Sequence, residues 1–215
     1  IESLHKVLEE TIRYTTYQLD TAEGAVAKEY LEKRGLDKNI REIFQIGFNP
    51  SGNSLSRYLS AKGYTQEQMC DANVANVYGG RVSDVFDGRI TFPIHDASGK
   101  PIGFSARSMD PQNPSKYVNT NETDVFHKGN IVFNYHRARS AARHEGRIYV
   151  CEGVTDVIAF ARAGISNAVC TLGTSCTAAQ IALLKRSAAR IVFCYDGDHA
   201  GQAATFRAGR MAVES

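Results

Sequence analysis

Two acidic residues with one residue between them follow the apolar run in the segment IVFCYDGDHAGQAA. They are Asp196 and Asp198, and a third acid, Glu152, directly follows another apolar run, IYVC. Neighbouring carboxylates raise each other's pKa and resist joint ionisation unless a cation lies between them. Oxygen ligands in small number, with water completing the shell, suit Mg²⁺ or Mn²⁺. The three acids therefore indicate a site for such a cation.

The elements that must position these acids are predicted by the pattern of the second half of the chain. Short apolar runs alternate there with segments of helical pattern, which predicts parallel strands covered by helices on both faces. We expect strands at 148–151, 167–172 and 191–194. We expect helices from Thr155 to Ala163, from Thr177 to about Ser187 and from about Ala200 onward. This is a doubly wound βαβαβ unit, in which ligands bind at the carboxyl ends of the strands.

The spacing of the aspartates allows two interpretations. If the segment is extended, Asp196 and Asp198 point the same way, and Gly197 lets the chain turn so that both face one ion. The alternative is an Asx-turn followed by an N-cap for the next helix. Asp156, four residues after Glu152, is either a structural acid in the first helical turn or a side chain that holds a metal-binding carboxylate.

The first half predicts a mixed α/β arrangement. Leu4, Val7, Leu8 and Ile12 recur at helical spacing, and a second helix is expected to stop at Gly35. Further on, the pattern predicts a short strand at 43–48, helices at 53–61 and 65–71, and a β-hairpin at 89–107 with its turn at 96–99.

Composition limits the class of protein. The chain has 215 residues, of which 43% are apolar and 22% charged, with a net charge of +2, so disorder is excluded. Five cysteines without a CxxC pair favour a reducing compartment, and no apolar run is long enough to span a membrane. Between Lys100 and Arg147, eight Lys or Arg residues stand against four Asp or Glu, which suits a polyanionic partner as well as a solvated surface.

Several motifs resemble a known family. EGVTD at 152–156, TLGT at 171–174 and YDGDHAGQAA at 195–204 resemble a Toprim domain. The stretches YLEKRGL, GRITFPIHDASGKPIGFSAR, SKYVNTNETDVFHKG and LGTSCTAAQ resemble the RNA polymerase domain of bacterial DnaG-type DNA primase. The resemblance covers nearly the whole chain. It implies an N-terminal α/β subdomain with a basic cleft at 1–146, followed by a partial Toprim subdomain at 147–215.

The resemblance also implies roles for single residues. Glu152, Asp196 and Asp198 would be the catalytic and metal-binding acids, with two or more Mg²⁺ or Mn²⁺ ions in the intact domain and no zinc site in this piece. The residues on the family's template- and nucleotide-binding positions are Arg34, Arg107, Lys116, Tyr117, Asn119 and Lys128. Without the resemblance, ordinary surface or core packing is the better interpretation of these six. The chain stops before the family's last acidic pair, so the isolated piece is expected to polymerise poorly or not at all.

The function implied is that of a cytoplasmic, nucleoid-associated bacterial primase, a nucleotidyltransferase of the primosome. It would synthesise short RNA primers on single-stranded DNA from ribonucleoside triphosphates during replication, as a monomer, with a replicative helicase bound through a missing C-terminal module. Two alternatives remain open. One is a Toprim nuclease or topoisomerase fragment. The other is a non-catalytic module that binds single-stranded nucleic acid and uses its acids only to cap helices.

Overall fold

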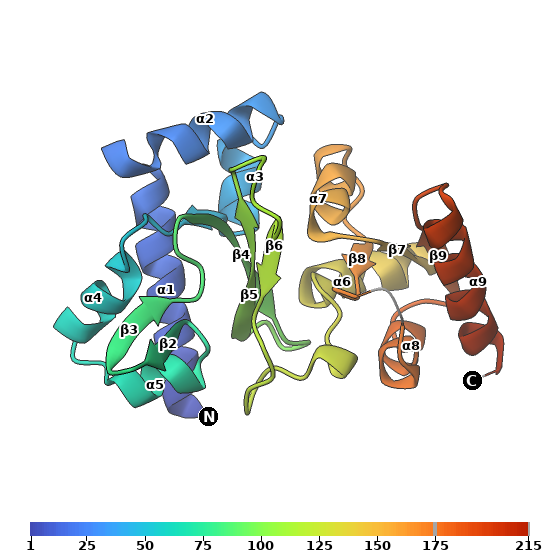
Figure 1. Ribbon diagram of the computed structural model, residues 1–215. Helices are drawn as coiled ribbons and strands as arrows, with labels where there is room; N and C mark the ends of the chain where they lie inside the picture. Colours follow the sequence, from blue (N-terminus) through green and yellow to red (C-terminus); the bar gives the residue numbers. More distant parts are fainter. Residues whose placement is uncertain (174–175, 215) are drawn as a thin grey trace. The chain divides into compact units, whose positions relative to one another are not determined.

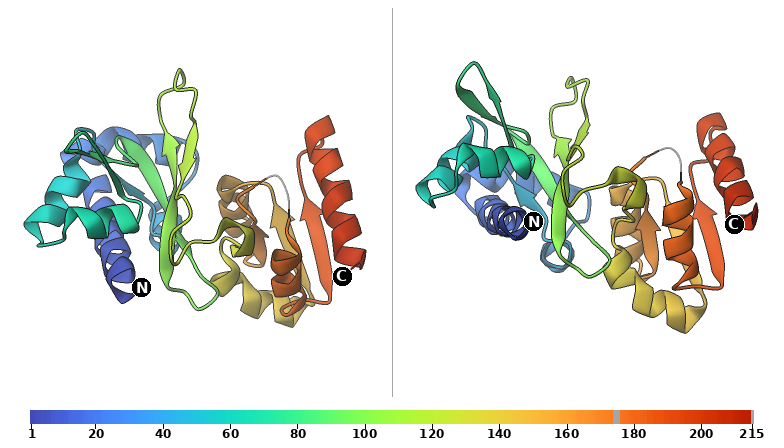
Figure 2. Two further views of the ribbon diagram at one scale, coloured as in Figure 1. Left: turned by 60° about the horizontal axis from the view of Figure 1, so that its bottom comes forward. Right: turned by 90° about the horizontal axis from the view of Figure 1, so that it is seen from below.

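The chain folds as two compact units. The computed structural model describes residues 1–173 and 176–214 (Figure 1), and two further views are given in Figure 2. Unit 1 comprises Ile1–Ile94 and Pro101–Phe126, and unit 2 comprises His95–Lys100 and His127–Ser215. The subdomain boundary that the sequence places between residues 146 and 147 stays a prediction. No helix in the described part of the chain is long and apolar enough to cross a membrane.

Unit 1 begins with a long amphipathic helix. Its helices are α1 (Glu2–Leu19), the short 3₁₀ helix η1 (Ala22–Gly24), α2 (Ala25–Lys33), α3 (Lys38–Ile43), α4 (Ser54–Ala61) and α5 (Gln66–Asp71). Leu4, Val7, Leu8 and Ile12 are all buried, as their spacing predicts. Gly35 follows α2 with φ at +74°, a left-handed conformation that glycine adopts without strain. The predicted helix end is therefore confirmed.

The strands of unit 1 form antiparallel pairs. They are β1 (Gly47–Phe48), β2 (Ala75–Tyr78), β3 (Arg81–Asp84), β4 (Arg89–His95), β5 (Pro101–Ser108) and β6 (Tyr117–Asn119). One sheet has the order β1-β4-β5-β6, and β2 pairs with β3 separately. The neighbouring strands β4 and β5 are joined by a turn closed by a hydrogen bond from Asp96 N to Lys100 O (2.9 Å), which confirms the predicted hairpin.

One short element of unit 1 differs from the prediction. The segment 43–48 was expected to be a strand, but Ile43 ends helix α3 and only Gly47 and Phe48 pair with β4. The cause is an N-cap: the Asp37 side chain accepts a hydrogen bond from Ile40 N at 2.9 Å and so starts a helix six residues long. A helix this short shows too little periodicity to be recognised from apolar spacing.

Unit 2 has the predicted doubly wound arrangement. Its elements are η2 (Lys128–Asn130), α6 (Tyr135–Glu145), β7 (Arg147–Cys151), α7 (Val154–Arg162), β8 (Ala168–Cys170), α8 (Ala178–Lys185), β9 (Arg190–Cys194) and α9 (His199–Glu214). The strands are parallel in the order β8-β7-β9. The expected α/β fold with a parallel βαβαβ unit is therefore confirmed.

Helices cover both faces of this sheet. Ile148 and Val150 of β7 belong to a core shared with residues of α6, α8 and α9. Tyr149 points to the other face, because side chains alternate along a strand, and its ring lies 5.6 Å from that of Phe160 on α7. Figure 1 shows α7 and α8 on opposite sides of the strands. The chain thus runs from the central strand β7 to β8 at one side of the sheet. It then crosses back over β7 to β9 at the other side.

The helix starts in unit 2 were predicted with mixed success. Thr177 caps α8 as expected, accepting a hydrogen bond from Gln180 N at 3.1 Å. Thr155 does not cap α7, because the N-cap is Gly153 and Thr155 lies inside the first turn. Glycine is a tolerated N-cap, and the sequence signal of a hydroxyl residue was misleading here. Thr174 and Ser175, which belong to the TLGT and LGTSCTAAQ motifs, lie outside the described residues.

Candidate functional site

The carboxyl edge of the unit 2 sheet brings two acids together. Cys151 of β7 pairs with Cys194 of β9, so the residues that follow the two strands leave the sheet side by side. Glu152 is half-buried there and shares a side-chain hydrogen bond with the exposed Asp196. Partial desolvation, this hydrogen bond and the charge of Asp196 raise the pKa of Glu152, and the charge of Asp198 adds to the effect.

This pair occupies the topological switch point of the sheet. The chain turns from β7 toward β8 on one side and toward β9 on the other, and ligands bind at such points in open α/β sheets. Two carboxylates in contact are unfavourable when both are ionised, so they hold either a shared proton or a cation. Their oxygen donors suit Mg²⁺ or Mn²⁺. The pair therefore fits a divalent cation.

Asp198 is placed differently from the sequence prediction. The segment after β9 is not extended, and the Asp198 side chain accepts a hydrogen bond from Gly201 N at 2.7 Å, capping helix α9. Within residues 1–173 and 176–214, no group of three or more His, Cys, Asp and Glu side chains is arranged to hold a metal ion. The extended conformation expected for this segment is therefore not observed, and the projection of Asp196 and Asp198 toward one ion stays a prediction. The assignment of Asp198 as a ligand remains a prediction.

Asp156 has a structural role at the start of α7. Its carboxylate accepts a hydrogen bond from Gly153 N at 3.1 Å, which satisfies one of the unpaired amides of the first helical turn. This amide directly follows Glu152, so Asp156 fixes the backbone that carries the half-buried acid. Of the two interpretations from the sequence, the structure shows the helix-capping one.

Gly201 is a functional candidate that the sequence analysis missed. A Cβ atom added at this position would lie 2.0 Å from the carbonyl oxygen of Asp196, so only glycine fits. The first turn of α9 thereby packs directly against the backbone of the acidic loop. Its position in the sequence could have revealed it. Gly201 is the third residue of α9, after the Asp198 cap, and glycine weakens a helix, so its presence there indicates a close packing contact.

Lys128 lies at the same edge of the same unit. It begins η2, and a Cβ added to Gly173, after β8, would lie 3.6 Å from the Lys128 Cε. Gln180 anchors this segment through hydrogen bonds from its Nε2 to Lys128 O (3.2 Å) and Ile131 O (2.8 Å). Unit 2 therefore places a cation beside the end of β8 and acids at the ends of β7 and β9.

The predicted cationic residues of unit 1 gather on β5 and β6. Arg107 and Tyr117 are register partners, and Arg107 Nη1 donates a hydrogen bond to the Tyr117 hydroxyl at 2.7 Å. Asn119 lies two residues further along β6 on the same face. Within the described residues, Arg107 Nε and Asn119 Oδ1 are buried without a hydrogen-bond partner. Buried polar atoms are almost always paired, so these two need a polar partner from outside the chain, such as water or a ligand.

Tyr30 joins this group from helix α2 and was not recognised from the sequence. The Arg34 guanidinium lies 3.5 Å from the centre of the Tyr30 ring, and that of Arg107 lies 5.8 Å from it. The Arg107 guanidinium is also 5.2 Å from the Tyr117 ring. Arginines and aromatic rings thus alternate on one surface, an arrangement that binds phosphates and stacks bases.

Lys116 is exposed just before β6, and its backbone rather than its side chain has a visible role. Its carbonyl oxygen accepts hydrogen bonds from Ser108 N (2.9 Å) and from Arg89 Nη1 (3.3 Å). Arg89 is buried and also donates to Ser115 O at 2.8 Å. Its guanidinium therefore holds the loop before β6 in place.

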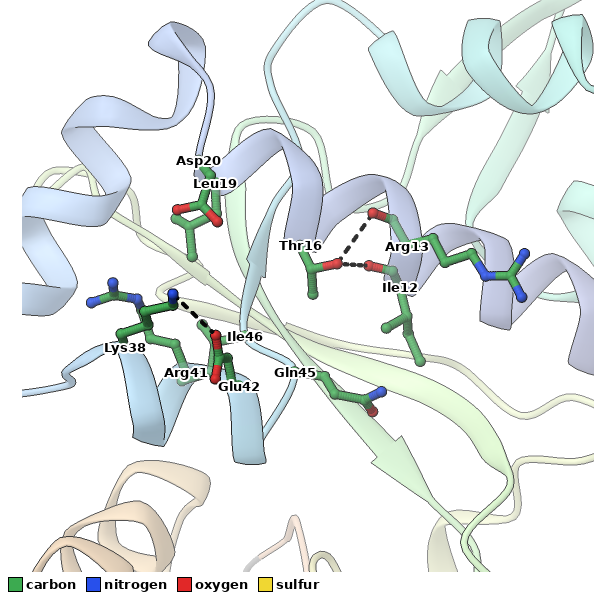
Figure 3. Close-up of a pocket in the computed structure, with 10 residues that line it drawn as sticks. All are labelled: Ile12, Arg13, Thr16, Leu19, Asp20, Lys38, Arg41, Glu42, Gln45 and Ile46. Carbon is green, nitrogen blue, oxygen red and sulfur yellow. Dashed lines mark hydrogen bonds and ion pairs between the residues drawn. The ribbon is translucent and has the colours of Figure 1, made fainter.

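The pocket drawn in Figure 3 contains none of the predicted residues. It lies in unit 1 between α1 and α3 and has a volume of about 320 Å³. Apolar side chains such as Ile12, Leu19 and Ile46 line it together with charged ones. Several of the charges are paired within the protein, as with Lys38 and Glu42 at 3.7 Å. The charges that line the pocket therefore do not indicate a particular ligand.

Comparison with known protein families shows which family this chain belongs to. Residues 14–139 match the model of the DNA primase catalytic core, N-terminal domain. The chain belongs to the DNA primase catalytic core family. Residues 146–215 match the Toprim domain, so both predicted resemblances of the primase core are confirmed.

Individual primases agree with the family assignment. The DNA primase of Escherichia coli K12 is 38% identical over 216 residues, covering 99% of this chain and 37% of that protein. The DNA primase of Listeria monocytogenes is 37% identical over 203 residues, covering 91% of this chain and 32% of its own length. The chain spans about a third of the length of these curated relatives.

Solved primase structures share the fold. A DnaG primase catalytic domain bound to ssDNA matches with a TM-score of 0.88 and 38% identity, covering 98% of this chain and 66% of that one. The RNA polymerase domain of Mycobacterium tuberculosis primase DnaG, in complex with a double-stranded DNA oligomer with an overhang, has a TM-score of 0.89 and 31% identity. It covers 97% of this chain and 68% of that one.

Proposed function

We propose that this chain is the catalytic core portion of a DNA primase that synthesises RNA primers on single-stranded DNA. The observation that carries the proposal is the Glu152–Asp196 carboxylate pair at the switch point of the unit 2 sheet, in a chain of the primase family. The relative solved with ssDNA supports the choice of template. The ribonucleoside triphosphates, the RNA primer, the replicative helicase and the cytoplasmic location remain proposals.

The acids at this edge would hold the divalent cations of the reaction. The hydrogen-bonded pair Glu152 and Asp196 would supply ligands, and Asp198 would join them on leaving the N-terminus of α9. Bound Mg²⁺ or Mn²⁺ supplies charge stabilisation for the attacking and leaving oxygens of phosphoryl transfer. Lys128 would bind phosphate oxygens beside the end of β8.

Unit 1 would hold nucleic acid and nucleotide. Arg107 and Arg34 offer guanidinium groups for bidentate phosphate contacts, and Tyr30 and Tyr117 offer faces for base stacking. The unpaired Asn119 Oδ1 would accept a hydrogen bond from a base or a sugar. These groups position the substrates, which is most of what a protein contributes to phosphoryl transfer.

The alternative of a non-catalytic module has specific support, because Asp198 and Asp156 both cap helices. Extension of an RNA primer on a DNA template, measured with labelled ribonucleotide and Mn²⁺, separates the two functions. Glu152→Gln should lower whatever incorporation the unaltered chain supports to background, since electrostatic stabilisation of this kind is typically worth about 100-fold. Glu67→Gln, on the exposed surface of α5, is the matched control and should leave incorporation unchanged.

Binding of Mn²⁺ to the folded chain should also raise its melting temperature, because a ligand that binds only the folded state stabilises it. The increase should disappear in Glu152→Gln. Absence of both incorporation and Mn²⁺ stabilisation in the unaltered chain would favour the non-catalytic module.

A further inference from the structure

Unit 2 separates its charges between the two edges of its sheet. From residue 127 to the end, the sequence has eleven Lys or Arg and six Asp or Glu. Four of the acids, Glu152, Asp156, Asp196 and Asp198, follow β7 and β9 at the carboxyl edge. The opposite, amino edge is where strands begin and where α6, α7 and α8 end. The basic residues found there are Arg143, His144, Arg147, Arg162, Lys185, Arg186 and Arg190.

Two arginines lie next to each other at this amino edge. Arg147 and Arg190 are the first residues of the neighbouring parallel strands β7 and β9, and they are register partners. Paired strands lie about 4.8 Å apart, so the two exposed side chains start from adjacent positions on the same face. Like charges directly across a strand pair are destabilising. Within the described residues, neither guanidinium has an ion pair or a side-chain hydrogen bond to offset the repulsion.

The helix dipole explains only part of this charge. Cations in the last turn of a helix are stabilised by its C-terminal partial charge, which accounts for Arg143, Arg162 and Lys185. Strands have only small net dipoles, so the same argument does not reach Arg147 and Arg190. The nearby acid Glu145 accepts a hydrogen bond from Asn167 Nδ2 at 3.1 Å instead.

We propose that Arg143, Arg147, Arg186 and Arg190, here called the amino-edge surface, bind the phosphate backbone of nucleic acid. The argument is charge complementarity: four exposed arginines from two strand starts and two helix ends lie at an edge where the acids are Glu145 and Glu214, and Glu214 is paired with Arg210 at 3.0 Å. Arginine forms bidentate contacts to phosphate oxygens. Such contacts are to the phosphate backbone and carry no sequence preference. The surface lies at the opposite sheet edge from the proposed metal centre, and its role does not depend on catalysis.

The test measures how binding of a labelled oligo-dT strand changes with salt, in EDTA so that the metal centre plays no part. Arg147→Gln/Arg190→Gln should reduce the slope of log K against log salt by about 1.4, since each lost single-strand phosphate contact contributes about 0.7. Lys6→Gln/Lys62→Gln, which removes the same charge from exposed ion pairs of unit 1, should leave the slope nearly unchanged. Glu67→Gln, on the exposed surface of α5, should also leave it unchanged, and the EDTA keeps the proposed metal centre out of the measurement.

A slope equal to that of the unaltered chain in Arg147→Gln/Arg190→Gln would overturn the proposal. Weaker binding of poly-glutamate by that variant, with unchanged DNA binding, would instead assign the surface to an acidic protein and would equally overturn it. The double variant should melt at the same or a higher temperature, because it removes a like-charge contact. If it does not fold, Arg143→Gln/Arg186→Gln, at the helix ends of the same surface, should show the same reduction in slope.

Discussion

At the scale of single residues, the acids after β7 and β9 have different surroundings although they follow equivalent strand ends. Glu152 is half-buried against Asp196, whereas Asp198 is committed to Gly201 N at 2.7 Å. A cation that binds the pair would compete with the positive end of α9 for the carboxylate of Asp198. The side chain that caps the helix is thus also a carboxylate whose charge acts on Glu152.

One buried and one half-buried histidine in unit 2 should make its stability depend on pH. His95 is 6% exposed and its ring lies 4.7 Å from that of His136. Burial, together with the positive charges of Arg137 and His136, lowers the pKa of His95 to about 3, although Asp96 opposes this shift. Burial and the charge of Arg137 likewise lower the pKa of His136 to about 4.

Because the folded pKa of His95 lies below its unfolded value of about 6.5, the unfolded chain binds more protons at mildly acidic pH. The contribution of neutral His95 to the free energy of unfolding is then fully present above about pH 6.5. It falls by roughly 1.4 kcal/mol for each pH unit below that value. Denaturant unfolding of His95→Phe, compared with the unaltered chain between about pH 6.5 and 5.5, should show a shallower pH dependence. His144→Gln, an exposed histidine of α6, should not change it. Equal pH dependence in all three proteins would show that His95 is not buried in its neutral form.

At the scale of secondary structure, the start of α9 positions the acidic loop. The backbone of Gly201 packs against the carbonyl of Asp196, leaving no room for a Cβ. Gly201→Ala should therefore displace the loop and destabilise the chain by about 1–3 kcal/mol, as overpacking typically does.

The same helix contains a matched control for this prediction. Nothing lies within 4 Å of a Cβ added at Gly209, so Gly209→Ala should stabilise the chain by about 0.5–1 kcal/mol. Chemical denaturation of the two variants measures both effects. Equal stabilisation by the two alanines would contradict the close approach at Gly201.

Features that depend on a local sequence pattern were predictable from the sequence. Features that depend on contacts between distant segments were not. The apolar runs of β7 and β9 fixed the strand ends, so Glu152 and Asp196 were correctly expected at one edge. The capping role of Asp198 depends on where α9 starts, which periodicity does not resolve. Tyr30 was missed because its partner Arg107 lies far away in sequence, on a strand that only the tertiary fold brings to α2.

At the scale of the whole molecule, the chain is a member of the primase core family with its functional groups divided between two units. Unit 1 contributes alternating arginine and tyrosine side chains, and unit 2 contributes acids at one sheet edge and arginines at the other. Overall composition gave no sign of this, since the net charge is only +2. The distribution of charge follows from the parallel topology, which sends strand ends to one edge and helix ends to the other.

The most direct test of the central claim is the anomalous signal of Mn²⁺ in crystals of this chain soaked with the ion. The structure predicts a peak bridged by the carboxyl groups of Glu152 and Asp196, and loss of that peak in crystals of Glu152→Gln. Asp198 within ligand distance of the ion would show that the α9 cap had opened. A soaked crystal with Mn²⁺ bound elsewhere, and with the carboxyl pair still sharing its hydrogen bond, would contradict the assignment of this edge as the metal centre.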